Sequence, residues 1–328
     1  MHSIRRTEAR SWRTRATQLL ARLWQGSPPL TVVGVVMLVV AIPSLAGVFI
    51  DPRMITGAPA WLKPFKFAIS AAIYCLTLAW IFAFLMEQAR MRRVVGWVTA
   101  IVFVVEVAII DLQAWRGTTS HFNVATVSDR VLFAVMGSAI MIQTFVSVGV
   151  AVALWRRQLN DRALGWALRF GMTLTIVGAM TGSLMTRPTS EQMANVRAGG
   201  DMTIIGAHTV GAPDGGAGVP VTGWSREHGD LRVPHFIGLH AIQALALVAV
   251  GLRRLHRREA IRVRLVIAAA ASYALLFLLL LWQALRGQSI VAPDGMAVAS
   301  IAMWAAVTML TFGWIELASR GQLHRSVA

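Results

Sequence analysis

The chain has 328 residues, of which 56% are hydrophobic and 14% are charged, and its formal net charge is +16. Soluble domains carry about 25% charged residues. The low charge and the long apolar runs therefore exclude an ordinary soluble domain and predict an all-α integral membrane protein. The single cysteine, Cys75, excludes an intrachain disulfide and a metal site built on paired cysteines.

Eight apolar runs are long enough to span a bilayer as helices, which needs about 20 residues. They cover 30–50, 66–86, 94–112, 131–155, 163–186, 235–252, 265–286 and 296–318. The first run follows arginines, as in a signal peptide, but it is long and has no clear cleavage site, so we predict a retained span. Pro64 and Pro234 are expected in the first turn of the second and sixth helices, where proline is well tolerated.

The distribution of the basic residues predicts the orientation. Most of the 31 lysines and arginines lie in segments that share one side of the membrane, including residues 1–29 and the tail 319–328. The positive-inside rule then places both termini in the cytoplasm of a bacterial inner-membrane protein. Anionic lipids at the cytoplasmic face account for the charge, so no nucleic-acid partner is predicted. Residues 8–24 are expected to form a basic amphipathic helix on that surface.

Two short stretches predict an internal duplication. Gln113–Gly117 reads QAWRG, and Gln283–Gly287, 170 residues later, reads QALRG. Further pairs recur at the same offset without a gap, namely Pro64 with Pro234 and Arg92 with Arg262. We therefore predict two parallel four-helix repeats, 30–155 and 163–318. An arginine followed by a glycine is also typical of a helix end, so the motif predicts a C-terminal cap before it predicts a ligand contact.

The second repeat contains a long connection, 187–234, where the first repeat has a short one. It is rich in glycine, with nine glycines from Gly199 to Gly229. Loops of this length are usually functional or disordered. Trp224 and the apolar pair at 204–205 favour an ordered cap on the extracytoplasmic face. The stretch GAPDGGAG lacks the Gly-Lys-Ser/Thr ending of a phosphate-binding loop, so we exclude that interpretation.

Ionisable and imidazole side chains within a bilayer are costly and indicate function. Those near the extracytoplasmic ends of the predicted spans are Lys63, Lys66, Glu106, Asp111, Arg116, His121, His235, His240, Gln243 and Arg286. Glu106 and His240 both lie roughly 9 Å below the outer boundary, at about 1.5 Å per residue. A contact between them would reduce the cost of burying each. Alternatively, Glu106 pairs with an arginine such as Arg116 or Arg286.

His235 and His240 occur in the second repeat only, because Phe65 and Ser70 occupy the matching positions of the first. On a regular helix, with about 100° per residue, the two imidazoles point about 140° apart and cannot bind one metal ion together. Two histidines that occur in only one of two similar repeats are what we expect of a specialised binding pocket. Alternatively, each is an interfacial histidine bonded to a carbonyl group.

Three classes of function fit these residues. In the first, His240, with His235 or His121, ligates the iron of a haem in a redox protein. The arrangement of four plus four spans with histidines resembles the haem A synthase family in outline, which implies haem as the cofactor. The chain departs from that family because it has no inward EXXH motif and no histidines at matching positions of both halves. No HxxxH or HExxH pattern favours another metal.

In the second class, the chain transports or binds a small anionic solute. Six cations ring the predicted outer face, namely Lys63, Lys66, Arg116, Arg187, Arg232 and Arg286. Against transport, Gln143 is the only amide near the midplane. In the third class, a membrane enzyme or accessory factor acts at the outer leaflet, with Glu106 or His240 as acid or base and arginines holding a phosphate or carboxylate.

Overall fold

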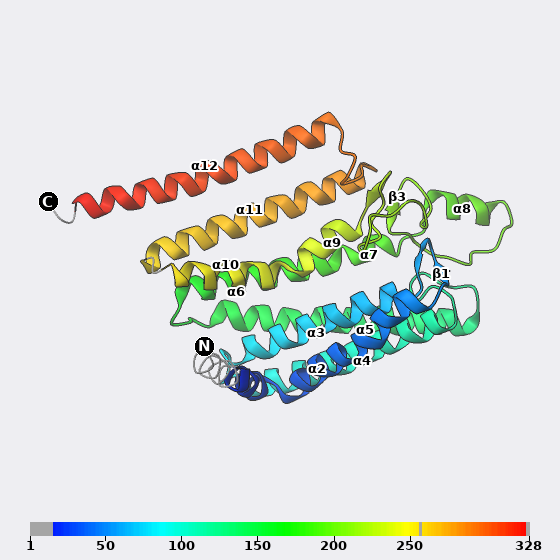
Figure 1. Ribbon diagram of the computed structural model, residues 1–328, viewed down its shortest axis with the longest axis horizontal. Helices are drawn as coiled ribbons and strands as arrows, with labels where there is room; N and C mark the ends of the chain where they lie inside the picture. Colours follow the sequence, from blue (N-terminus) through cyan, green and yellow to red (C-terminus); the bar gives the residue numbers. More distant parts are fainter. Residues whose placement is uncertain (1–15, 256–257, 326–328) are drawn as a thin grey trace, which may run out of the picture. The chain divides into compact units, whose positions relative to one another are not determined.

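The structure is a computed structural model that describes residues 16–255 and 258–325 (Figure 1). The chain divides into two compact units. Unit 1 consists of the residues up to Arg53 together with Pro59–Thr118 and Val135–Ala153. Unit 2 consists of Met54–Ala58, Thr119–Ala134 and the chain from Leu154 onward.

The chain is mostly helical, as predicted. Within the described residues, seven helical stretches are long and apolar enough to cross a membrane. They are α2 (Pro28–Ile50), α3 (Leu62–Phe82), α4 (Ala89–Trp115), α5 (Val127–Arg156), the run that begins with α6 (Arg162–Met180), α11 (Glu259–Leu285) and α12 (Gly295–Arg325). The pair α9 (Arg232–Leu239) and α10 (Ala241–Arg254) meets the same criterion together and is bent by 45°, so the number becomes eight if the pair is one span. Each of the eight predicted runs thus lies largely within helices, although the sixth is interrupted.

The predicted amphipathic helix at 8–24 lies partly outside the described residues. Its described part belongs to a helix over 16–26.

Small residues bring α2 and α3 together in unit 1. A side chain at Gly34 of α2 would lie 2.7 Å from the Leu76 side chain, and one at Gly26, at the end of the preceding helix, would collide with the carbonyl group of Ala79. The shared core is formed by Met37, Ala41, Ala68, Ala71, Ala72 and Val107. Close approach over small residues is the usual way in which membrane helices gain packing contacts.

Gln143, the amide predicted near the midplane, has a structural role in unit 1. Its Nε2 donates to the Ser147 hydroxyl at 3.3 Å and lies 3.5 Å from the Tyr74 hydroxyl. Gln143 therefore links α5 to α3.

The QAxRG motif ends α4 and α11 in the same way. Gly117 and Gly287 adopt left-handed conformations, with φ of 75° and 74°. The N–H groups of Gly117 and Gly287 bond to the carbonyls of Ala114 and Ala284. The residue after each glycine bonds back to the glutamine that opens the motif, at 3.0 Å in the first copy and 3.1 Å in the second. This pattern is the Schellman cap, so the predicted helix-ending role is confirmed.

The helices around the motif have matching bounds. Helix α4 covers Ala89–Trp115 and α11 covers Glu259–Leu285, so both of their ends differ by 170 residues. The starts of α3 and α9, Leu62 and Arg232, differ by the same number. Pro64 and Pro234 are each the third residue of their helix, and their predicted place in the first turn is confirmed.

The connection between α6 and α9 belongs to unit 2. It contains the short helices α7 (Gly182–Met185) and α8 (Ser190–Arg197) and the strands β3 (Thr209–Val210) and β4 (Gly229–Asp230). The two strands pair antiparallel, with Thr209 opposite Asp230. In the short connection after α2, β1 (Met54–Ile55) pairs with β2 (Ala58–Pro59).

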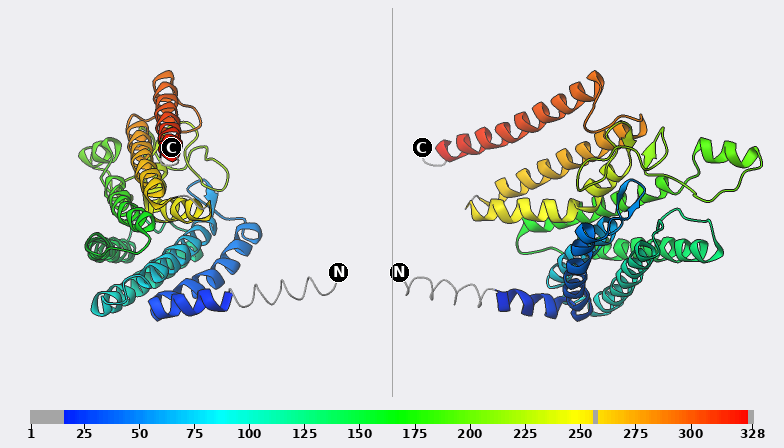
Figure 2. Two further views of the ribbon diagram at one scale, coloured as in Figure 1. Left: turned by 90° about the vertical axis from the view of Figure 1, so that its left-hand side faces the viewer. Right: turned by 45° about the vertical axis from the view of Figure 1, so that its right-hand side comes forward.

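Hydrogen bonds between side chains and the backbone hold this long connection in place. The Gln192 side chain bonds to both the N–H and the carbonyl group of Gly206, each at 2.9 Å. The Ser289 hydroxyl, just beyond the end of α11, donates to the Ser225 carbonyl at 3.0 Å. The connection therefore lies at one end of the unit 2 helices (Figure 2), and we call it the cap (residues 187–231).

Candidate functional site

The main irregularity of unit 2 is a break in the span formed by α9 and α10. His240 lies between the two helices, with φ of −90° and ψ of 4°, and the helices are bent by 45° there. The prediction that His235 and His240 share a regular helix is therefore wrong, and the angle of about 140° derived from it does not apply across the break. His240, a leading residue of the predicted site, occupies the break itself.

Hydroxyl groups from two other helices bond to the backbone at the break. The Thr175 hydroxyl, on α6, donates to the Leu239 carbonyl at 3.3 Å and accepts from the Ile242 N–H at 3.3 Å. The Tyr273 hydroxyl, on α11, donates to the Ile237 carbonyl at 2.7 Å. A lipid bilayer offers no water to such groups, so a broken membrane helix needs protein partners of this kind. The break is thus supported from two sides.

Glycines allow α6 to approach the break. A side chain on Gly178 or Gly238 would collide with the backbone of the other residue, and one on Gly171 would lie 2.7 Å from the Ile242 Cα. Gly171, Thr175 and Gly178 are spaced three and four residues apart, so they lie on one face of α6. This face combines close packing with the one hydroxyl that bridges the break.

A series of side-chain contacts connects the cap to the break. The Trp224 ring, in the cap, lies 5.8 Å from the Phe236 ring, which lies 4.4 Å from the His240 ring. The Gln243 side chain is close enough to the His240 ring to interact with it. The structure thus brings together two predicted residues, His240 and Gln243. It adds Phe236 and Trp224, which were not predicted because aromatic residues in such runs usually indicate packing alone.

His235 is held against α6. Its Nδ1 lies 2.8 Å from the Gly178 carbonyl oxygen and 3.1 Å from the Thr181 hydroxyl. This is the carbonyl-bonded arrangement that the sequence offered as the alternative to a ligand role. A bond of this kind also orients histidines that bind metals through the other ring nitrogen.

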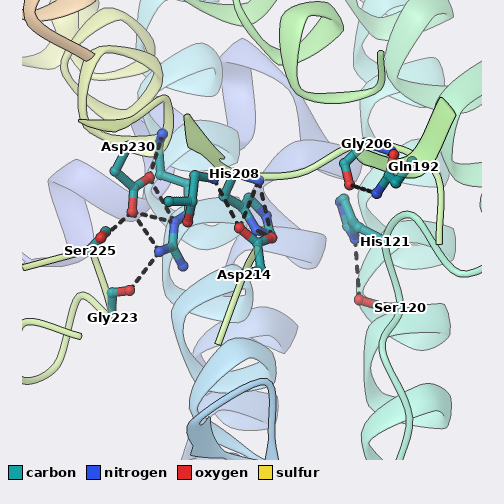
Figure 3. A network of polar contacts seen from close by, with 11 residues as sticks. Ser120, His121, Gln192, Gly206, His208, Asp214, Gly223, Ser225 and Asp230 are labelled. Atoms are coloured by element: carbon teal, nitrogen blue, oxygen red, sulfur yellow. Dashed lines mark hydrogen bonds and ion pairs between the residues drawn. The ribbon is translucent and has the colours of Figure 1, made fainter. Parts of the chain in front are cut away.

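The cap contributes a histidine and a carboxylate that the sequence analysis missed. His208 Nδ1 lies 2.6 Å from Asp214 Oδ2, and the backbone N–H groups of His208 and Thr209 donate to the same carboxylate (Figure 3). Burial raises the pKa of Asp214, but the bonds from His208 and Thr209 outweigh burial and hold the pKa well below its usual value. A histidine six residues before an aspartate in a glycine-rich loop matches no motif, so the sequence carried no signal for this pair.

His121, a predicted site residue, and Phe122, which was not predicted, lie near His208 of the cap. His121 Nδ1 lies 3.2 Å from the Ser120 hydroxyl (Figure 3). The Phe122 ring lies between two imidazoles, with its centroid 6.1 Å from that of His121 and 4.8 Å from that of His208. His208 is also close enough to His235 for an electrostatic interaction. Phe122 thus contacts the rings of both His121 and His208.

Acidic partners match two predicted arginines of unit 2. Arg286 bonds to Asp294 at 2.6 Å and lies over the Trp282 ring, 4.7 Å from its centroid. Its hydrogen bond lowers the pKa of Asp294. Arg232 bonds to the buried Asp230 at 2.6 Å. These arginines hold the chain around them, and neither carries an unmatched charge.

Five of the predicted residues belong to unit 1, namely Lys63, Lys66, Glu106, Asp111 and Arg116. Glu106 is buried, with 2% of its surface exposed, and the charge of Lys63 acts on it. Arg116 donates to the Gln113 side chain at 2.6 Å, and Lys66 is half-buried on α3. Because Glu106 is in unit 1 and His240 in unit 2, their contact stays a prediction.

The fold and this site define the chain as a polytopic α-helical protein of membrane type with an interrupted helix. Comparison with protein-family models, curated proteins and solved structures finds no match. Across residues 16–255 and 258–325, no cluster of three or more His, Cys, Asp or Glu side chains could hold a metal ion.

Proposed function

We propose that this chain is a multi-pass inner-membrane protein that binds and transports a small solute at the break between α9 and α10. The observation that carries the proposal is the break, because its backbone groups are bonded by Thr175 and Tyr273, His240 occupies it, and Gln243 lies in the first turn of α10. Interrupted membrane helices form the substrate sites of many transporters that are built from internal repeats.

The same proposal includes a duplication and an orientation. The matching bounds of α4 and α11 and the two identical helix caps support two parallel repeats, 30–155 and 163–318. The excess of basic residues on one side supports cytoplasmic termini. The cap and the break then face the extracytoplasmic side, and anionic lipids contact the opposite face.

Solute recognition is assigned to hydrogen bonding by His240 and Gln243, with Phe236 as an aromatic wall. Asp294 and Asp230 already match the charges of Arg286 and Arg232, so these arginines leave little net charge for a ligand. An anionic solute would therefore depend on the protonated form of His240. A polar neutral solute would use the imidazole and the amide alone.

Cysteine labelling tests the proposal without knowledge of the solute. The only cysteine, Cys75, is buried, so Cys75→Ala provides a thiol-free background. In this background, His240→Cys is expected to react with a membrane-impermeant thiol reagent in intact cells and in inverted vesicles, because a transport cycle exposes the break to each side in turn. Labelling from the extracytoplasmic side alone would indicate a binding protein.

The matched control is Leu247→Cys on α10, in the same interrupted span. Leu247 is 71% exposed and apolar, so we expect it to face lipid and to stay unlabelled, because the reagent reacts in water. A His240→Cys variant that resists the reagent from both sides, in folded protein, would refute the proposed site.

The bond between His235 Nδ1 and the Gly178 carbonyl favours haem binding as a second candidate function. It leaves Nε2 available to haem iron, and His240 lies on the same interrupted span. Haem would supply one-electron redox chemistry. An absorption spectrum of the purified protein tests this candidate, with a Soret band that disappears in His235→Ala or His240→Ala. A colourless protein without a pyridine-haemochrome signal would contradict it.

A further inference from the structure

Unit 1 contains an open groove of about 410 Å³ that lies apart from the residues assigned above. Apolar side chains of α2 and α4, including Pro43 and Leu112, line it together with Trp61, Trp115 and Asp111. The volume falls within the range of about 300–1,000 Å³ that is usual for small-molecule sites. Asp111 lies one helical turn before Trp115, the last residue of α4, so the groove is near the membrane boundary, where tryptophans are common.

Asp111 places an unpaired acceptor in this apolar groove. Its Oδ1 is buried and has no hydrogen-bond partner. Asp111 forms no ion pair within the described residues. An unbonded buried carboxylate oxygen is unfavourable, so a ligand that donates a hydrogen bond or carries a positive charge would stabilise it.

The other polar groups beside the groove are already engaged. Arg53 bonds to Asp51 at 2.6 Å and donates to the Trp115 carbonyl at 2.9 Å. The Trp61 indole N–H donates to Asp51 at 2.8 Å. Hydrogen bonds from Arg53 and Trp61 hold the pKa of Asp51 below its usual value, so Asp51 stays charged and matches Arg53. The groove is left with the single negative charge of Asp111.

We propose that this groove binds the alkylammonium group of an amphiphile. The ammonium would lie against Asp111, and the indole rings of Trp61 and Trp115 would contact its carbon atoms and favour its charge. The apolar tail would follow Pro43 and Leu112. An anion would be repelled by the carboxylate, and a calcium ion would need six to eight oxygen ligands, which one carboxylate cannot supply.

The test measures binding of radiolabelled dodecyltrimethylammonium to the full chain in phosphatidylglycerol nanodiscs, with the signal of empty nanodiscs subtracted. We expect saturable binding that Asp111→Asn weakens by about tenfold or more, since this variant removes the charge and keeps the shape. The control, Glu87→Gln, makes the same change of charge at an exposed position of unit 1 outside the groove and should bind like the wild type.

A second variant keeps the test decisive if Asp111→Asn fails to fold. Leu112 is 42% exposed, so Leu112→Trp can fill the groove from its open side with little change to the core, and it should abolish saturable binding. Unchanged affinity in folded Asp111→Asn or in Leu112→Trp would overturn the proposal. Equal displacement of the probe by the neutral amphiphile dodecyl maltoside would also overturn it.

Nanodiscs that contain phosphatidylethanolamine distinguish the sources of the ammonium group. Competition by this lipid, reduced in Asp111→Asn, would identify the natural occupant as a lipid amine of the surrounding bilayer. Probe binding that is unaffected by the lipid would identify another cationic amphiphile. Both results support recognition of an alkylammonium group by Asp111.

Discussion

Helix α3 in unit 1 and the pair α9–α10 in unit 2 begin at positions 170 residues apart, yet only one of them is continuous. Helix α3 runs from Leu62 to Phe82 without interruption. The segment that begins at Arg232 is interrupted at His240, at the position that corresponds to Ser70. The two segments thus begin at positions with the same offset, but only the second is interrupted.

The neighbouring residues account for the difference. At the position of Tyr273, whose hydroxyl bonds to the Ile237 carbonyl, unit 1 has Phe103, which has no hydroxyl and instead packs against the Tyr74 ring at 5.4 Å. At the position of Gly238, unit 1 has Ala68, which is fully buried in its core. A break in a membrane helix leaves backbone groups that need partners in other helices, and Tyr273 supplies one of them here.

The largest expected effect comes from the contact between Gly178 and Gly238 at the break. Gly238→Ala should destabilise the protein by about 1–3 kcal/mol, because the added carbon collides with the Gly178 backbone. Gly251→Ala, on α10, meets no atom within 4 Å and should be neutral or stabilising by up to about 1 kcal/mol, since alanine favours a helix. Equilibrium unfolding in mixed micelles measures both variants. Equal effects would show that close packing does not set the break.

A smaller effect is expected from the hydroxyls at the break. Thr175→Val removes both bonds of Thr175, and Tyr273→Phe removes one, so we expect losses of about 1–2 and about 1 kcal/mol, within the range for hydrogen bonds in membranes. Hydrogen exchange at Ile242 should rise in both variants.

The control in unit 1 is Thr144→Val. The Thr144 hydroxyl bonds only to the Ile140 carbonyl of its own helix, so its loss should change stability by less than about 0.5 kcal/mol. If Thr144→Val matched Thr175→Val, the bridging role of Thr175 would be refuted.

The smallest expected effect concerns the cap, which unit 1 lacks. Because the pKa of Asp214 is lower in the folded cap than the value of about 3.9 in an unfolded chain, its contribution to stability is complete above about pH 5 and is lost as the pH falls through the folded value. Hydrogen exchange at His208 and Thr209, corrected for intrinsic rates, should therefore increase below that pH.

Asp214→Asn should weaken protection at neutral pH and remove most of this pH dependence. Asp201→Asn, an exposed change in the same cap, should leave both unchanged. A cap in Asp214→Asn that kept the protection and pH profile of the wild type would contradict an anchoring role for the His208–Asp214 pair.

The amino-acid sequence by itself determined the positions of the helices and the way in which two of them end. Both properties are local, because a span needs only a run of apolar residues, and a Schellman cap needs only a glycine that tolerates a left-handed conformation. For the same reason, Pro64 and Pro234 were placed correctly in the first turns. The orientation of the termini and the contact between Glu106 and His240 stay predictions.

Only the tertiary structure decided that the sixth run is interrupted, that His208 bonds to Asp214, and that Asp111 lies in a groove with two tryptophans. Each of these features depends on partners that no local pattern identifies. Thr175 and Tyr273 lie in other helices than His240, and Trp61 lies 50 residues from Asp111. Hydropathy reports how much apolar surface a segment has, but it does not report which hydroxyl reaches which carbonyl. The bonds that satisfy a backbone within a membrane are set by packing between helices.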